Sequence, residues 1–407
     1  MTSAVVILGL VSLVYSLAFV GASRTFALAR GMYDRQHDRD GGPAYRPIPR
    51  IGGLGVLASL VLSVIVWKGM WSQAGGAGFG VVVVVLGVFV CCVGAVDDVR
   101  RVPASVKAAA LVGVGVVSFW SGLRIDAVPG LVVEIPWALS LPLTCVWFVA
   151  IPTAFNFVDG LDGLAAGLTL IAAVSLAAIG AAQGDATTVL FAVILGATSA
   201  GFWYHNKHPA RVFMGDSGAM LNGYLVAALA TRVLHGGDGG TTVAVAALLA
   251  WPATDFTLAI GRRVSRRRPF CPDAEHLHHL LARRLGHADA VKAIHCMAAA
   301  LAAAGLLATH GPSVTPTVVV LVGLCGTPLL IGRHAHLARF GRLSRSGAFA
   351  LFIVLFCSWH SEWIPSTASA PTASTPTSIE LARGGAQPVI LGSVGRAGVA
   401  PAEAQLP

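Results

Sequence analysis

Four polar segments of this chain carry residues that could do chemistry, and long apolar runs separate them. The first contains Asp97-Asp98, an adjacent pair of carboxylates. Two carboxylates this close repel each other, and burying them together raises their pKa values. A divalent cation or a cationic group of a substrate would remove that conflict. Lys107 follows at the expected start of the next helix, where it can point back to the same surface, although lysine there is often only an interface anchor.

The second segment is NFVDGLDG at 156–163. Asp159 and Asp162 are three residues apart, so they share a face if a helix begins here. Aspartate at a helix start also caps the helix, which is the structural alternative for either residue. Together with Asn156, the two carboxylates suggest a polar pocket.

The third segment, NKHPARVFMGDSG at 206–218, places an aromatic ring, a glycine and a carboxylate before an apolar run. Phe213 could stack on a nucleobase and Asp216 could ligate a metal ion. The alternative is an aspartate that caps the helix, with a packed phenylalanine beside it.

The fourth segment, FCPDAEHLHHLL at 270–281, contains His276, His278 and His279. The H-x-H-H spacing resembles a metal site, but few soft ligands lie nearby, so zinc is not preferred. Arginines precede the histidines at 262, 263 and 266–268. This neighbourhood favours an anion-binding patch, and membrane topology alone is the other explanation for the arginines.

The elements that position these segments must be transmembrane helices. Of the 407 residues, 55% are hydrophobic and only 12% are charged, with a mean hydropathy of +0.74. Soluble domains carry about 25% charged residues. The composition therefore argues against a cytosolic enzyme, a secreted disulfide scaffold and a disordered chain. The seven cysteines form no C-x-x-C pair and mostly lie in apolar runs, which indicates core residues.

Apolar runs long enough to cross about 30 Å of hydrocarbon recur along the chain. They cover residues 4–22, 51–67, 79–96, 104–121, 137–155, 163–182, 187–204, 215–234, 241–260, 293–309 and 315–332. We predict an all-α polytopic membrane protein, a bundle of about 11 transmembrane helices. Residues 1–335 would form the catalytic domain, 336–364 an extra or interfacial helix, and the Pro-, Ser- and Thr-rich stretch 365–407 a disordered tail.

The lysines and arginines predict the orientation of these spans. No basic residue precedes the first apolar run, so it is not a signal peptide, and we place the N-terminus outside. Alternation then collects 23 of the 28 basic residues on one side, which predicts that this side is cytoplasmic. The net charge of +9 is thereby explained without nucleic-acid binding. All four polar segments fall at cytoplasmic ends of helices, where a bundle can bring them together into an active site.

In this order, VDDVRRVP with its downstream lysine, NFVDGLDGLAAG, NKHPARVFMGDSG and RRRPFCPDAEHLHHLL resemble the polyprenyl-phosphate N-acetylhexosamine-1-phosphate transferases of glycosyltransferase family 4. RPIPRIGGLG at 46–55 resembles an early motif of that family. The likeness covers roughly residues 1–335. The H-x-H-H form and the PF-x-x-D lead-in are closer to the WecA-like branch than to the MraY-type branch that serves peptidoglycan synthesis.

The resemblance implies an Mg²⁺-dependent transferase, with Mn²⁺ as an alternative ion. Such an enzyme moves an N-acetylamino-sugar 1-phosphate from a UDP-sugar, by default UDP-GlcNAc, to polyprenyl phosphate, which is undecaprenyl phosphate in bacteria. It releases UMP, and the lipid-linked sugar initiates cell-envelope polysaccharides such as O-antigen. The enzyme would lie in the lipid bilayer of the inner (plasma) membrane. The sequence does not fix the sugar, the pathway or the oligomeric state, for which a homodimer is one option.

The resemblance also implies residue roles. The metal ligands would be Asp216 and Asp98. The catalytic residues would be Asp97, Asp98, Asp159, His276, His278 and His279, with the aspartate pair on the acceptor phosphate and the histidines on the donor. The substrate-binding residues would be Arg50, Lys107, Asn156, Asp162, Asn206, Phe213 and Arg262, with Asn206 and Phe213 on the uridine side.

Two alternatives stay open at this point. A carboxylate of the 97–98 pair could form a covalent sugar-phosphate intermediate, or the lipid phosphate could attack directly, which we favour because a phosphate monoester is largely dianionic at neutral pH. The rival class is a transporter or flippase. Transporter sites lie near the bilayer midplane between repeats, whereas these carboxylates lie at helix ends and the sequence has no evident repeat.

Overall fold

The computed structural model describes residues 2–32, 48–70, 77–127, 134–267 and 275–309. Within these ranges the chain folds into twelve α-helices and no strand, with one isolated bridge between Ala127 and Glu134. A helix satisfies its backbone hydrogen bonds internally, as a segment in hydrocarbon must. The predicted all-α class is confirmed.

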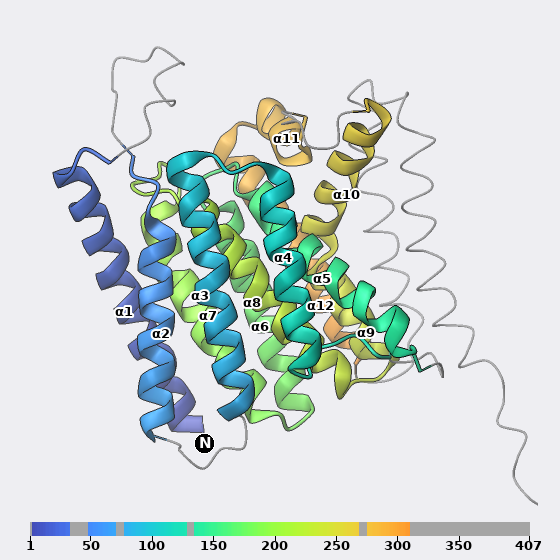
Figure 1. The fold of residues 1–407 in the computed structure, drawn as a ribbon. Helices are drawn as coiled ribbons and strands as arrows, with labels where there is room; N and C mark the ends of the chain where they lie inside the picture. The colour runs from blue at the N-terminus through green and yellow to red at the C-terminus, as the bar shows by residue number, and fades with distance from the viewer. Residues whose placement is uncertain (1, 33–47, 71–76, 128–133, 268–274, 310–407) are drawn as a thin grey trace, which may run out of the picture. The chain divides into compact units, whose positions relative to one another are not determined.

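Most of the helices follow the predicted apolar runs, and their arrangement is drawn in Figure 1. The helices are α1 (Thr2–Ala29), α2 (Gly52–Met70), α3 (Ala77–Arg100), α4 (Ala104–Trp120), α5 (Trp137–Val158), α6 (Leu164–Ala182), α7 (Ala186–Asn206), α8 (Gly215–His235), α9 (Gly239–Leu248), α10 (Ala250–Ser265), α11 (Leu277–Leu285) and α12 (His287–Ala308).

Six helices of the described part are long and apolar enough to cross a membrane: α1, α3, α5, α6, α7 and α12. The bent pair α9–α10 counts as a seventh, and α2 and α4 are apolar but shorter. The count of about 11 spans stays a prediction. The run at 315–332 and the predicted segments 336–364 and 365–407 lie outside the described residues.

The span predicted over 241–260 is broken in the structure. The chain forms two helices there, α9 and α10, which meet at an angle of 65°. Pro252 lies three residues into α10. A proline has no N–H for the preceding turn and its ring crowds the carbonyl four residues earlier, which in this chain belongs to Leu248, the last residue of α9. The bend turns α10 toward the segment that carries the histidines.

Helix α8 is the most enclosed helix, and it lies among α2, α3, α5 and α6. Small residues allow this close packing. A Cβ atom on Gly94 of α3 would lie 2.5 Å from the carbonyl oxygen of Asp216, and one on Gly53 of α2 would overlap the backbone of Gly218. The first turn of α8 is therefore pressed against α2 and α3, and this contact places Asp216 beside the end of α3.

Candidate active site

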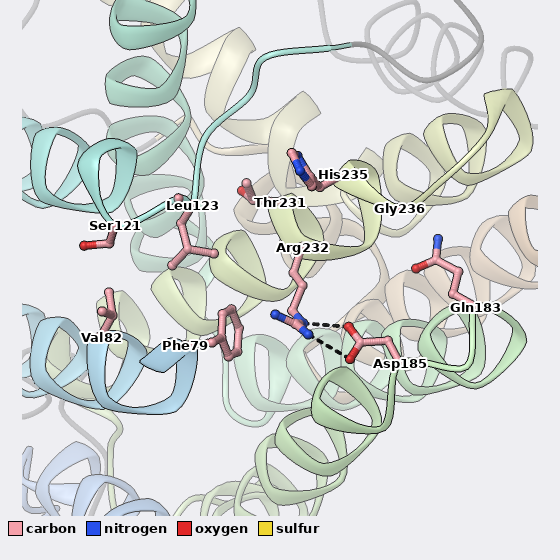
Figure 2. Close-up of a pocket in the computed structure, with 11 residues that line it drawn as sticks. Phe79, Val82, Ser121, Leu123, Gln183, Asp185, Thr231, Arg232, His235 and Gly236 are labelled. Carbon is pink, nitrogen blue, oxygen red and sulfur yellow. Dashed lines mark hydrogen bonds and ion pairs between the residues drawn. The ribbon is translucent and has the colours of Figure 1, made fainter. Parts of the chain in front are cut away.

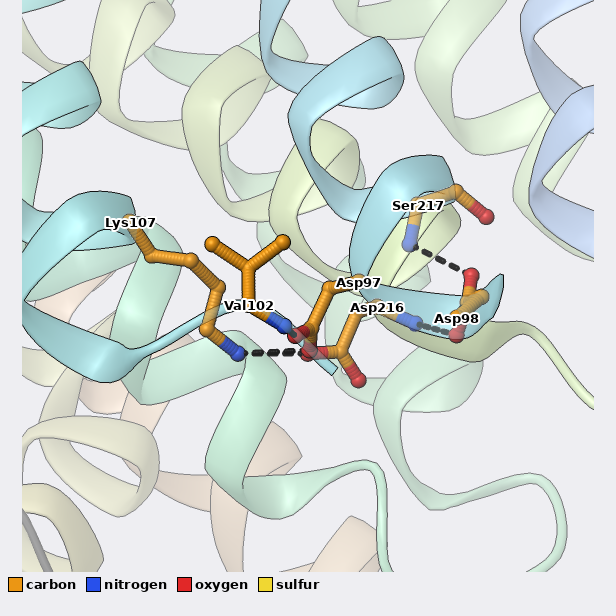
Figure 3. Close-up of polar contacts among 6 residues, drawn as sticks. All are labelled: Asp97, Asp98, Val102, Lys107, Asp216 and Ser217. Carbon is orange, nitrogen blue, oxygen red and sulfur yellow. Dashed lines mark hydrogen bonds and ion pairs between the residues drawn. The ribbon is translucent and has the colours of Figure 1, made fainter. Parts of the chain in front are cut away.

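A cluster of carboxylates around one lysine joins the ends of three helices (Figure 3). The Nζ atom of Lys107, near the start of α4, donates to Oδ2 of Asp97 at 2.7 Å and to Oδ2 of Asp216 at 2.9 Å. All three side chains are largely buried. The prediction that Lys107 points back to the Asp97 surface is confirmed. One cation thus bridges two carboxylates that are 119 positions apart in the sequence.

Asp98 caps the start of α8. Its carboxylate accepts hydrogen bonds from the backbone N–H groups of Asp216 at 2.9 Å and of Ser217 at 3.1 Å. The first N–H groups of a helix have no partner within the helix, so a carboxylate there stabilises it. The cap therefore comes from α3, and the side chain of Asp216 does not cap its own helix. Gly215, with φ +74°, fits here because a Cβ atom would lie 2.5 Å from Oδ2 of Asp98.

The last turn of α5 and the loop that follows it each add one of the predicted residues to the same cluster. The Asn156 amide contacts the Asp216 carboxylate. Burial, and then the negative charge of Asp216, raise the pKa of Asp159 well above its usual range, while Arg50 opposes that shift. Asp159 therefore needs a proton or a cation at neutral pH. The cluster offers carboxylate and amide oxygens, which are the ligands that Mg²⁺ and Ca²⁺ prefer.

Asp162 lies near this loop but has other partners. Its Oδ2 atom accepts from Nδ1 of His208 at 2.8 Å and from the backbone N–H of Ala210 at 3.1 Å. Its own N–H donates to Nε2 of His287 at 2.8 Å. Helix α6 begins only at Leu164, so Asp159 and Asp162 do not share a helical face as predicted. Asp162 instead joins its loop to the α7–α8 segment and to α12.

Asn206, at the end of α7, forms hydrogen bonds to the loop before α6 and to the segment between α7 and α8. Its side chain is 3% exposed, its Oδ1 accepts from the N–H of Gly163 at 2.8 Å, and its Nδ2 donates to the carbonyl of Val212 at 2.8 Å. Phe213 is partly buried, and its backbone bonds to Pro49 and Gly52 on either side of Arg50. The uridine contacts assigned to Asn206 and Phe213 stay predictions.

His278 and His279 lie against the same α5–α6 loop, and the ring of His276 contacts that of Phe157 near the end of α5. A Cβ atom on Gly160 would overlap Nε2 of His278 and lie 2.9 Å from Cε1 of His279. Burial, followed by the neighbouring His278 and His276, lowers the pKa of His279 to about 4. His279 is therefore a neutral imidazole at pH 7. The arginines of α10, of which Arg262 is buried in the last turn, carry positive charge for the predicted anion-binding patch that does not depend on His279.

Three polar residues of this region were not predicted as site residues. His208 and His287 stack at 4.5 Å between ring centroids and contact Asp162. Asp255, in α10, is completely buried and contacts the histidine segment. One signal could have identified Asp255, because an ionisable residue within an apolar span is functional by default.

A separate cavity of about 370 Å³ lies at the other ends of α3 and α8 (Figure 2). Phe79 and Arg232 line it, and both are more than a dozen residues from the carboxylate cluster along their helices. Arg232 pairs with Asp185 at 2.6 and 3.0 Å and its guanidinium lies 4.6 Å from the ring centroid of Phe79. The cation of this cavity is already matched by a carboxylate, so the cavity is not the candidate active site.

Comparison with known proteins identifies a matching family and several relatives. The family model described as glycosyl transferase family 4 matches residues 80–234. A Bacillus subtilis (strain 168) protein named "Probable undecaprenyl-phosphate N-acetylglucosaminyl 1-phosphate transferase" is 31% identical over 299 residues, which cover 72% of this chain and 81% of that protein. The decaprenyl-phosphate N-acetylglucosaminephosphotransferase of Mycolicibacterium smegmatis is 33% identical over 312 residues, 69% of this chain and 76% of the relative.

A third relative, the phospho-N-acetylmuramoyl-pentapeptide-transferase of Heliobacterium modesticaldum, is 38% identical over 153 residues, 36% of this chain and 45% of that protein. The fold and the site define a multi-pass helical membrane protein with a cluster of carboxylates and one lysine at the ends of three helices. The chain belongs to the polyprenyl-phosphate N-acetylhexosamine-1-phosphate transferases, within glycosyl transferase family 4.

Proposed function

We propose that the protein transfers N-acetylglucosamine 1-phosphate from UDP-GlcNAc to a polyprenyl phosphate and releases UMP. The product is the lipid-linked sugar that begins a cell-envelope polysaccharide. The names of the Bacillus subtilis and Mycolicibacterium smegmatis relatives support the transfer of this sugar phosphate to a polyprenyl phosphate. The observation that carries the proposal is the convergence of Asp97, Lys107 and Asp216 from three helices beside Asp159.

The reaction needs two anions to approach each other. An oxygen of the lipid phosphate attacks the β-phosphorus of the UDP-sugar, the bond between that phosphorus and the bridging oxygen breaks, and UMP leaves with the bridging oxygen. A phosphate monoester has a second pKa of about 6, so it is a competent nucleophile at neutral pH. The protein must supply proximity and charge compensation.

Lys107 is the group that meets the acceptor phosphate in this proposal. Its ammonium lies between the Asp97 and Asp216 carboxylates at 2.7 and 2.9 Å, so it is held in place and ready to exchange one carboxylate for a phosphate oxygen. Asp97 orients the lysine and is itself held by the backbone N–H of Val102 at 2.5 Å. Asp159, beside Asn156, would face the donor.

Asp216 would hold Mg²⁺, with Asp98 as the second ligand. The oxygen donors around Asp216, including the Asn156 amide, fit this ion. Both Asp98 oxygens already accept backbone N–H groups, which leaves Asp216 as the principal ligand. When bound, Mg²⁺ supplies charge neutralisation at the diphosphate.

The experiment for this function measures UMP release by the purified protein in detergent with Mg²⁺. We expect UMP only when UDP-GlcNAc and a polyprenyl phosphate are both present, and less with other UDP-sugars of a panel. A transporter or flippase would release none. Absence of UMP with every donor and lipid would contradict the proposal.

We propose that the active site lies at the cytoplasmic face of the inner (plasma) membrane. We predict that a cysteine at position 265, at the end of α10, reacts only with cytoplasmic maleimide, and that one at position 121, at the end of α4, reacts from outside. Both sites are exposed serines. The labels are placed singly in a variant that lacks the seven native cysteines. External labelling at 265 would overturn the assignment for the whole site.

A substitution at Gly160, in the loop between α5 and α6, tests whether the histidines must lie close to this loop for the transfer reaction. We predict that Gly160→Ala lowers the transfer rate at least about tenfold, roughly 1.4 kcal/mol in the barrier, because the new methyl group displaces His278 and His279. Gly113→Ala in α4 is the control, since a Cβ atom there meets open space among the described residues. Equal rates for both variants would show that the histidines need not approach this loop.

A further inference from the structure

Asp255 of α10 holds the beginning of α11 by two hydrogen bonds. Its side chain is completely buried. Oδ1 accepts from the backbone N–H of Leu277 at 2.7 Å, and Oδ2 lies 2.7 Å from Nδ1 of His278. Nδ1 of His276 lies 3.4 Å from the same Oδ2. Burying a carboxylate costs free energy even when it is paired, and packing alone would favour an apolar residue here. The buried Asp255 therefore points to a role other than packing.

The ring of His278 is oriented by this contact. Because the Asp255 carboxylate accepts, Nδ1 of His278 must carry a proton, and the ring cannot rotate without breaking that bond. Nε2 is buried and has no hydrogen-bond partner among the described residues. It faces Gly160, where an added Cβ atom would overlap it. The neighbour of Gly160 in the chain is Asp159, which interacts with the carboxylate cluster.

We propose that Asp255 is a positioning residue that acts through His278. It fixes the ring with Nδ1–H toward the buried carboxylate and Nε2 toward the diphosphate of the nucleotide sugar. In the imidazolium form, Nε2–H then donates to a phosphate oxygen while Asp255 balances the charge at Nδ1. This inference rests on the proposed function, because it assigns His278 a partner on the UDP-sugar. A carboxylate that orients a catalytic histidine follows the same logic in serine proteases.

The competing reading of the same residues is a metal site. Asp255, His276 and His278 each offer a ligand atom, and the three atoms lie within 4.8 Å of one another. The 2.7 Å distance between Nδ1 of His278 and Oδ2 of Asp255 is that of a charge-assisted hydrogen bond. Two ligand atoms bound to tetrahedral zinc at about 2.0 Å lie about 3.3 Å from each other. The distance between Nδ1 and Oδ2 is shorter than that. We therefore assign a proton, and not a metal ion, to this contact.

The test is a double-mutant cycle in the full-length protein. Asp255→Asn keeps the shape but leaves one acceptor for two donors, so Nδ1 of His278 loses its partner or the ring changes tautomer. We expect kcat to fall about 100-fold, as for other residues that orient a ligand or base. His278→Gln should cost a similar factor, and the double variant should be no slower than His278→Gln alone. Asp238→Asn, at the cap of α9, is the matched control and should keep wild-type activity.

Two further measurements keep the proposal falsifiable if Asp255→Asn does not fold. His278→Asn retains an amide where Nδ1 lies but has no group at Nε2. We expect it to keep wild-type thermal stability and to lose activity about 100-fold. A stable and active His278→Asn variant would reduce Asp255 to a structural role. If the losses of the two single variants multiply in the double variant, Asp255 also has only a structural role. One equivalent of zinc that the wild type retains and Asp255→Asn loses would show that the contact is a metal site.

Failure of the proposed function gives a different pattern. If the wild type transfers no sugar phosphate, the affinity for UDP is measured by calorimetry for the wild type, the two single variants and the double variant. The positioning role predicts at least tenfold weaker UDP binding for Asp255→Asn and no further loss in the double variant. Unchanged UDP binding in both single variants would overturn the role of Asp255 independently of the reaction.

Discussion

Replacement of Asp216 by asparagine is expected to lower the transfer rate by about 10³-fold, roughly 4 kcal/mol in the barrier. The asparagine keeps the shape and one carbonyl oxygen but loses the charge that would hold Mg²⁺. The helix should still form, because its cap comes from Asp98 through backbone N–H groups that the substitution leaves in place. The measurement is initial UMP release at several Mg²⁺ concentrations, and higher Mg²⁺ should restore part of the rate.

The matched control for this prediction is Asp126→Asn. Asp126 also forms an ion pair, with Arg124 at 2.9 Å, and lies 3.3 Å from Nδ1 of His235, but it is near the opposite ends of α4 and α8 from Asp216. Its loss should leave the rate within about twofold, as expected for an exposed ion pair. Normal turnover by Asp216→Asn would mean that Asp216 contributes only to the packing around Lys107.

The second prediction with a large expected effect is that UMP release depends completely on the polyprenyl phosphate. Direct attack by the lipid phosphate predicts no UMP release when the enzyme meets UDP-GlcNAc alone, even at stoichiometric enzyme concentration. The geometry supports this choice. Both oxygens of Asp98 hold the start of α8, and Asp97 is held by Lys107 and by the N–H of Val102. A covalent route would require one of these carboxylates to give up its partners before it attacks phosphorus.

Rapid-quench measurement with lipid-free enzyme distinguishes the two routes. We expect a flat baseline that rises only when polyprenyl phosphate is added. A burst of one UMP per enzyme without lipid, abolished by Asp98→Asn, would instead establish a covalent sugar-phosphate intermediate. Aspartate to asparagine at position 98 keeps one acceptor oxygen for the α8 cap, so a loss of the burst would not simply report a disrupted helix.

Much of the fold follows from composition, because a helix is the only way for a single apolar segment to satisfy its backbone in hydrocarbon. The ten apolar runs up to residue 309 all lie on helices. The bend between α9 and α10 was missed although Pro252 is visible in the sequence. Proline in a membrane helix is tolerated without a break, as at Pro142 and Pro152 inside α5, so its presence alone does not decide the angle.

The candidate site was predicted unevenly for a related reason. Residue type and order pointed to Asp97, Lys107 and Asp216, because charged residues at the same-side ends of several apolar runs can meet at one face of a helix bundle. Which atoms they contact depends on helix packing, so the sequence could not reveal that Asp98 caps α8 or that Asp162 bonds His208. Asp255 was missed because it lies within α10, whereas the predicted site residues lie near the ends of the apolar runs.

The most direct test of the account is mass analysis of the lipid after incubation of the purified protein with Mg²⁺, UDP-GlcNAc and polyprenyl phosphate. We predict that the polyprenyl phosphate gains one N-acetylhexosamine and one phosphate, with one UMP released for each lipid converted, and that Asp216→Asn forms both products about 10³-fold more slowly. A lipid that stays unmodified under conditions where the folded wild-type protein binds UDP-GlcNAc would contradict the transfer reaction.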